Sequence, residues 1–547
     1  MLLILAVVGA ILVAAIADRH GREPALVIVI VGIAASFTPG FPGLDIDSEV
    51  LLSVVLPPLL YSAALGFSFP TFLRNIRPIL GLGVGLVVVT AFAVAAVASW
   101  VVAPLTFGTA LILGAVVAPP DAVTAVAVGR KLGLPKRVMA ILTGESLVND
   151  AAALTLFSIA VAQVAGTQAF IANPVLLFGY SAVVGPLVGV VLGYATLWIR
   201  KRLDNPGLET VQGLLVPFAA FLCAEHLHAS GVLAVVVAGF VVGHGTLSAG
   251  YQTRLQERYV WNSLDVLLEA FVFAYIGLHM RFVLEDLHEA HESVVQVGIA
   301  ALIVLAVALV IRPVWVFLMF GRGLLFRHVR RTLSAPAPSS DSGAVGAPGQ
   351  SRLGWRENAV VSWTGMRGVV TLAAASGIPL TTSTGEEFPE RATIQAIAFV
   401  VSVGTLLLQG GTLPWLIRRL GVSDEADAAY DLAETAKAED VVRRAAEEVL
   451  VRFDAAPSSG LDPAVRAEIR QVIARHSQDA DEMPDPEEHT LRAEVFAALY
   501  RDVLARQRAA LIAERDAGRI DDEVVREMLE RLDLQEAGVT ARLDSRF

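Results

Sequence analysis

Long runs of apolar residues alternate with short polar segments over about the first 420 residues of the 547-residue chain. A transmembrane helix needs roughly 20 consecutive, mainly apolar residues to cross the hydrocarbon core of a bilayer. The pattern therefore predicts an all-α polytopic membrane protein with about thirteen transmembrane helices. The predicted spans are 2–16, 25–38, 50–65, 79–103, 107–128, 137–165, 174–199, 210–228, 231–246, 263–280, 293–320, 355–378 and 392–417.

Basic residues gather in every second loop between these spans, as in the pairs Arg74/Arg77 and Arg254/Arg258. Cytoplasmic loops of membrane proteins carry such an excess of lysine and arginine. We therefore expect a multi-pass protein of the plasma membrane, with its N-terminus outside and its C-terminus in the cytoplasm.

Composition changes sharply near residue 421. The chain as a whole is 55% hydrophobic and 17% charged, with a net charge of −11, but the acidic residues concentrate in its last quarter. One cysteine, Cys223, excludes an intrachain disulfide, and no basic footprint for nucleic acid is present. We predict a transmembrane domain over 1–420, with a flexible cytoplasmic linker at 332–351. An acidic helical domain would follow over 421–547, with helices near 425–453, 462–477, 490–516 and 520–536.

The tail allows two readings. It is either a solvated helical appendage that helps folding or dimerisation, or a sensor.

Polar residues interrupt the span 137–165 at Thr143–Asp150. A carboxylate at the centre of a membrane helix costs roughly 2.5–3.5 kcal/mol on insertion scales, so an intramembrane acid indicates a functional site. Helical spacing places Glu145 with Asn149 on one face, and Ser146 with Asp150 on another. Carboxylate and hydroxyl oxygens are ligands that hard cations prefer. The segment predicts an ion site.

Two other spans contain a predicted break. In 107–128, Pro119 and Pro120 precede Asp121 and remove two backbone donors; a simple kink with a structurally paired acid is the alternative. In 355–378, Arg367 lies between two glycines and needs a carboxylate partner, for which Glu145, helped by Asn149, is the best candidate.

If helices 1–6 and 8–13 form two inverted repeats, each break falls in the fifth helix of its repeat. Breaks at corresponding positions of two repeats are typical of transporters whose binding site lies at the middle of the membrane. Arg312, before Pro313, is expected to snorkel to the cytoplasmic surface.

Gly144-Glu145-Ser146-Leu147-Val148-Asn149-Asp150 resembles the signature of the monovalent cation:proton antiporter-1 family, the bacterial NhaP type and eukaryotic sodium–proton exchangers. Leu56–Tyr61, the break at Asp121 and Met366–Val370 resemble its other motifs in the expected order. The resemblance covers roughly residues 1–420, and the tail more weakly resembles those of bacterial members, at Arg515–Ile520 and Leu532–Leu534.

The resemblance implies a homodimer in which a core domain moves like an elevator and exchanges Na⁺ for H⁺, for pH and sodium homeostasis. It implies a Na⁺ site at Asp150, Asp121, Ser146, Glu145 and the backbone carbonyl of Pro120, with Asn149 and Arg367 pairing structurally. Relatives often have threonine where this chain has Pro120. The pair Asn149–Asp150 implies electroneutral exchange, and no cofactor beyond the transported ions.

The chemistry agrees with this implication, because burial near other carboxylates favours the protonated form of Asp150, so that a proton and a cation compete for it. The alternatives are a K⁺/H⁺ antiporter, or a cation channel without proton coupling. An enzyme is not expected, since no zinc-protease, nucleophile-elbow or P-loop motif stands out.

Overall fold

The computed structural model describes residues 2–38, 50–121, 123–167, 170–171, 173–203, 205–246, 249–333, 353–422, 425–455 and 490–544, with a few positions between 466 and 473. Within these ranges the regular secondary structure is helical, apart from an isolated β-bridge between Thr381 and Glu387. The chain divides into two compact units. The all-α prediction is confirmed.

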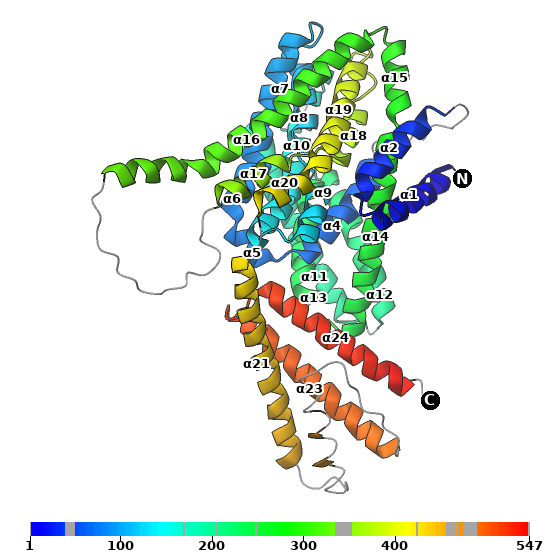
Figure 1. Cartoon of the computed structure of the whole chain (residues 1–547). Coiled ribbons are helices and arrows are strands. Elements are labelled where there is room, and N and C mark those ends of the chain that lie inside the picture. The colour runs from blue at the N-terminus through cyan, green and yellow to red at the C-terminus, as the bar shows by residue number, and fades with distance from the viewer. Residues whose placement is uncertain are drawn as a thin grey trace. The chain divides into compact units, whose positions relative to one another are not determined.

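The first unit comprises Met1–Arg202, Val211–Gly243 and Val260–Asp424. Most of its helices, which are labelled in Figure 1, coincide with the apolar runs of the sequence. In chain order they are α1 (Leu2–Arg19), α2 (Pro24–Ser36), η1 (Leu51–Val55), α4 (Leu56–Gly66), α5 (Phe69–Arg74), α6 (Ile76–Leu80), η2 (Gly81–Leu86), α7 (Val87–Val101), α8 (Phe107–Val117), α9 (Val123–Leu132), α10 (Lys136–Ala165), α11 (Pro174–Arg200), α12 (Pro206–His226), α13 (Gly231–Thr246), α14 (Tyr251–Leu278), α15 (Met280–Glu289), α16 (Val294–Leu333), α17 (Trp355–Trp363), α18 (Val369–Ser376), α19 (Arg391–Thr405), η3 (Leu406–Gly410) and α20 (Gly411–Leu420).

Seven helical segments of the described residues are long and apolar enough to cross a membrane, and four shorter apolar helices accompany them. Every predicted span overlaps at least one helix, while the number of crossings stays a prediction. Helix α14 starts at Tyr251, well before the predicted 263, because its charged first turns carry no hydropathy signal. The predicted linker 332–351 lies almost entirely outside the described residues.

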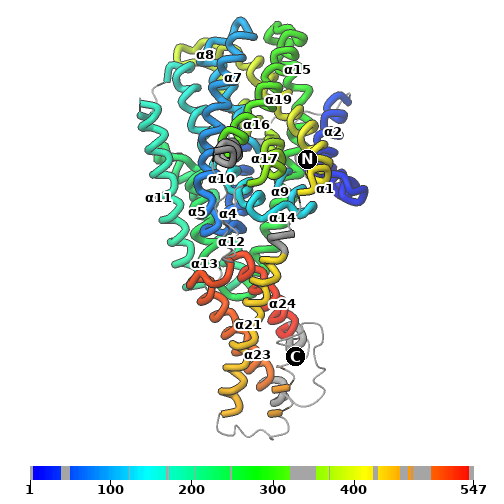
Figure 2. The backbone as a smooth tube through the Cα atoms, turned by 60° about the vertical axis from the view of Figure 1, so that its left-hand side comes forward, coloured from blue at the N-terminus to red at the C-terminus, as the bar shows by residue number. Residues whose placement is uncertain are grey.

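Helices α7, α8, α10, α16 and α19 pack side by side at the centre of this unit (Figures 1 and 2). The approach of α7 to α8 depends on Gly114, where a Cβ atom would lie 2.9 Å from the backbone carbonyl carbon of Ala91. Pieces of two broken helices, α8 with α9 and α17 with α18, contact α10 within the same core. The packing thus surrounds the predicted site with helices from both halves of the sequence.

The second unit comprises Leu203–Thr210, His244–Tyr259 and Glu425–Phe547, and so includes the start of α12, the end of α13 and the first turns of α14. Its helices α21 (Glu425–Ala455), α23 (Thr490–Asp516) and α24 (Asp522–Asp544) bury an apolar core that includes Leu511 and Val525. Three of the predicted tail helices are present, and α24 extends eight residues beyond the predicted 536. The predicted helix at 462–477 lies largely outside the described residues.

Candidate functional site

Two helix breaks meet at the centre of the first unit. Helix α8 ends at Val117, and α9 begins at Val123 after the two prolines. Helix α17 ends at Trp363 and α18 begins at Val369. The Asp121 amide donates a 2.6 Å hydrogen bond to the carbonyl of Met366, which joins the two non-helical segments. Both predicted breaks are therefore real, and they lie against each other.

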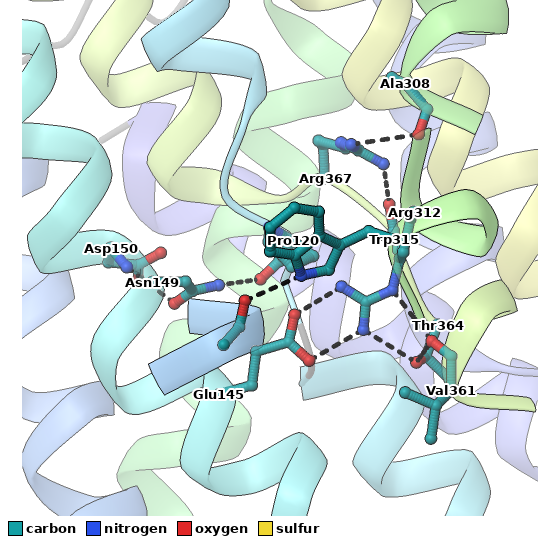
Figure 3. Close-up of polar contacts among 12 residues, drawn as sticks. Pro120, Glu145, Asn149, Asp150, Ala308, Arg312, Trp315, Val361, Thr364 and Arg367 are labelled. Carbon is teal, nitrogen blue, oxygen red and sulfur yellow. Dashed lines mark hydrogen bonds and ion pairs between the residues drawn. The ribbon is translucent and has the colours of Figure 1, made fainter. Parts of the chain in front are cut away.

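Polar side chains satisfy the backbone groups that these breaks leave without helical partners. The Arg367 guanidinium donates from Nε to the Val117 carbonyl at 3.0 Å, and so caps the end of α8. It also contacts the carbonyls of Gly365 and, at 3.5 Å, Ala308 (Figure 3). On α19, Thr405 accepts from the Arg367 amide at 3.0 Å. Non-helical backbone at membrane depth is tolerated where such partners exist.

Arg367 does not pair with Glu145 as the sequence indicated; Arg312 does. The Arg312 guanidinium donates Nη1 and Nη2 to the two oxygens of Glu145, at 2.5 and 2.9 Å (Figure 3). It also donates to the Val361 carbonyl at 2.9 Å. Both charged side chains are only 2% exposed. The expected Glu145–Arg367 pair is wrong because Arg367 is occupied by carbonyls and α16 supplies a second buried guanidinium.

The expected snorkelling of Arg312 is also wrong, because this side chain is buried against α10 and α17. One feature of the sequence could have predicted the burial of Arg312. Arg312 is the only charged residue in Val294–Phe320, the most apolar of the candidate spans. A single guanidinium so placed requires a carboxylate partner inside the protein.

Asn149 and Asp150 lie on α10 beside the broken segment of α8 and α9 (Figure 3). The Asn149 amide donates to the Pro120 carbonyl, and its oxygen accepts from the Asp150 backbone amide at 2.7 Å. Asp150 is buried and lies close enough to Asp121 for the two carboxylates to interact electrostatically. Ser146, one turn before Asp150, is half-buried. The predicted site residues are thus gathered around one crossing.

Gly368 lets Asp121 lie against the second broken helix. A Cβ atom at position 368 would come within 2.6 Å of the Asp121 carboxyl carbon. The sequence indicated these glycines only as a source of unwinding. The structure gives Gly368 the further role of making room for an acid.

The described residues contain no group of three or more histidine, cysteine, aspartate or glutamate side chains that could hold a metal ion. At the crossing, both Glu145 oxygens contact Arg312, so the carboxylates left near each other are Asp121 and Asp150. Carboxylate, hydroxyl and carbonyl oxygens are ligands of the kind that hard cations prefer.

Comparison with known proteins gives a consistent result. A family model described as "Sodium/hydrogen exchanger, transmembrane" matches residues 2–419. An uncharacterised Na⁺/H⁺ exchanger of Mycobacterium tuberculosis is 30% identical over 98% of this chain and 95% of its own length. The Na⁺/H⁺ antiporter ApNhaP of Aphanothece halophytica is 28% identical over 81% of this chain and 76% of its own.

Among solved structures, the sodium proton antiporter MjNhaP1 from Methanocaldococcus jannaschii matches with a TM-score of 0.57 and 18% identity. The match covers 76% of this chain and 97% of that one, and it shows a shared fold. The predicted family is confirmed, and this multi-pass membrane protein belongs to the sodium/hydrogen exchanger family of transporters.

Proposed function

We propose that this protein exchanges one monovalent cation, Na⁺ before Li⁺ or K⁺, for one proton without net charge movement. The observation that carries the proposal is the set of buried charges at the crossing. Arg312 is matched by Glu145, and Arg367 lies next to the segment that bears Asp121. If Asp121 balances Arg367, one negative charge remains, on Asp150. One proton or one monovalent cation neutralises that charge equally.

Competition for Asp150 then couples the two fluxes. A buried carboxylate that is ionised and unpaired is unfavourable, so the site is stable with either a proton or a cation bound. If the site can move between the two sides of the membrane only when its charge is neutralised, it must bind the other ion before it can move back. Alternating access of this kind needs movement of the helices that carry the site.

The proposed cation ligands are Asp150, Asp121, Ser146 and the carbonyl of Pro120. A carbonyl oxygen has two lone pairs, so Pro120 can accept from Asn149 and still bind a cation. We leave Glu145 out of the ligand set, because Arg312 contacts both of its oxygens. Na⁺ is favoured over K⁺ because the named relatives are Na⁺/H⁺ exchangers and antiporters.

We further propose a homodimer in the plasma membrane that serves pH and sodium homeostasis, with a cytoplasmic C-terminus. The loop containing Arg254 and the tail containing Asp533 are both predicted to be cytoplasmic from their charge pattern. Their ion pair within the second unit supports this orientation.

Everted membrane vesicles with an acid interior and a fluorescent probe of the pH difference test the exchange. We expect dequenching on addition of Na⁺, a smaller response to K⁺, and none from Asp150→Asn at equal protein content. Asp18→Asn is the matched control, because Asp18 is 69% exposed and its partner Lys131 is exposed as well. Dequenching by Asp150→Asn, or its absence from the folded natural protein, contradicts the proposal.

Two measurements separate the alternatives. Currents from protein reconstituted in planar bilayers should be absent for electroneutral exchange. A cation-dependent current coupled to proton movement would overturn the one-for-one stoichiometry, and a current without proton movement would establish a channel.

A further inference from the structure

One buried hydroxyl group beside the crossing is left without a hydrogen bond. Thr371 lies in the first turn of α18 and is only 1% exposed. Its Oγ1 atom has no hydrogen-bond partner among the described residues. Most buried polar side-chain atoms in native proteins have such a partner, so an exception of this kind requires a physical explanation. The cation ligands proposed above do not include this hydroxyl.

The break between α17 and α18 accounts for the missing bond. A threonine inside a helix can donate its hydroxyl to the backbone carbonyl four residues earlier, as Thr155 on α10 does at 2.7 Å. For Thr371 the carbonyls three and four residues earlier belong to Gly368 and Arg367, which precede the first residue of α18. Both carbonyls accept from the hydroxyl of Ser402 on α19, at 3.4 and 3.2 Å. They point away from α18, and the Thr371 hydroxyl is therefore left without a local acceptor.

The position of Thr371 in the helix places its side chain next to Asp121. Gly368 is the N-cap residue of α18, and Thr371 is the third residue of the helix. Side chains at these two positions are neighbours, as in a capping box. Gly368 has no side chain, and a Cβ atom there would lie 2.6 Å from the carboxyl carbon of Asp121. The Asp121 carboxylate therefore occupies the place of an N-cap side chain, beside Thr371.

The same turn of α18 also faces α10. Val370, the residue before Thr371, packs against an apolar cluster that includes Leu147 and Ala151. Each of these two residues directly follows a proposed cation ligand of α10. Successive residues of a helix point about 100° apart. The side chain of Thr371 therefore points between the direction of Val370, toward α10, and that of Gly368, toward the acid of the other broken helix.

We propose that the Thr371 hydroxyl is a further ligand of the transported monovalent cation. The proposal rests on the exchange function proposed above, and it adds an oxygen from the second broken helix to the ligand set. A hydroxyl oxygen has two lone pairs, and oxygen atoms are the ligands that hard cations prefer. The bound cation is then held by α10 and by both broken helices, so its arrival links the Asp121 segment to α18.

The Na⁺ dependence of exchange in everted vesicles tests this ligand. Thr371→Val replaces the hydroxyl with a methyl group and keeps the shape of the side chain. Loss of one polar contact to a charged group should raise the half-saturating Na⁺ concentration about tenfold. The maximal rate should stay the same to within about twofold, because the lost contact contributes to binding. Thr371→Ser keeps the hydroxyl and should keep the half-saturating concentration of the natural protein.

Thr90→Val is the matched control for the loss of a buried hydroxyl. Thr90 on α7 is also 1% exposed, and its Oγ1 also lacks a hydrogen-bond partner in the part of the chain that the structure describes. Neither valine variant breaks a hydrogen bond, so both should fold, and Thr90→Val should keep the natural Na⁺ dependence. An unchanged half-saturating concentration in Thr371→Val overturns the proposal. An equal rise in Thr90→Val or in Thr371→Ser overturns it too, because the effect would then not come from this hydroxyl.

Binding of Na⁺ to the purified full-length protein separates this proposal from the exchange function. In detergent at alkaline pH and constant ionic strength, a ligand that binds the folded protein raises its Tm. The Na⁺ concentration that produces a given rise should be about tenfold higher for Thr371→Val and unchanged for Thr90→Val. Exchange by the natural protein without this shift in Thr371→Val overturns the ligand and leaves the exchange function. The shift without exchange by the natural protein supports the ligand and overturns the exchange function.

Discussion

The buried pair of Arg312 and Glu145 gives the most direct test of how this site is built. Both side chains are 2% exposed, and two hydrogen bonds of 2.5 and 2.9 Å join them. Arg312→Met keeps an apolar side chain of similar length but leaves the Glu145 carboxylate buried without its partner. Removal of one member of a buried ion pair typically costs about 3–5 kcal/mol.

That loss is large enough to measure by thermal unfolding of the purified protein in detergent. Because the first unit has roughly 400 residues, it corresponds to a fall in Tm of about 4–6 °C. Arg281→Ala is the control, since Arg281 and Glu285 form an exposed pair one turn apart, worth about 0–1 kcal/mol. The double variant Arg312→Met/Glu145→Leu should recover most of the lost Tm, because neither charge of this pair is left buried without its partner.

A fall in Tm for Arg312→Met no larger than that for Arg281→Ala would show that Glu145 does not depend on this partner. A double variant less stable than Arg312→Met would show that the loss comes from packing and not from an uncompensated charge.

Three further predictions concern the crossing and the tail. Gly368→Ala should abolish Na⁺-dependent dequenching in vesicles while the protein stays folded, because the new methyl group displaces Asp121; normal transport would contradict the close approach. Asn149→Leu should lower Tm by an amount that corresponds to about 1–3 kcal/mol, because a buried carbonyl loses its donor, and an unchanged Tm would count against that bond. In the tail, Arg506 donates to Glu448 at 2.8 Å and lowers the pKa of that carboxyl from its usual 4.5. This pair should therefore stabilise the tail above pH 4.5 and lose its contribution as the pH falls through the lower folded pKa, so the protection factors of natural protein and Arg506→Ala should converge in acid.

The sequence by itself determined the fold class, the positions of the breaks and the family. Apolar runs near 20 residues long define spans whatever their packing, because the bilayer sets their length. Consecutive prolines before Asp121 and glycines around Arg367 act on the local backbone, so their effect is visible without tertiary contacts. The acid-rich stretch around Asp150 is costly in lipid and therefore marks a site in the sequence itself.

The choice of charge partners was decided only by the tertiary structure. Arg312 and Arg367 both require compensation at membrane depth, and nothing in their local sequence tells which of them reaches Glu145. The answer depends on which carbonyls the crossing leaves without donors: Val117 and Gly365 take Arg367, and Arg312 is left for the carboxylate. Ion pairing acts over distance in space, and 167 residues separate Glu145 from Arg312 along the chain.

The partner of Arg254 could not be predicted from the sequence either, because it too is distant along the chain. Its position in a basic loop predicted only the side of the membrane, whereas folding of the second unit brought it to Asp533, 279 residues away. Local sequence fixes which groups need a partner, because burial and backbone geometry follow from short patterns. Which partner each group receives depends on long-range packing, and in this protein that packing gives Glu145 the buried partner Arg312.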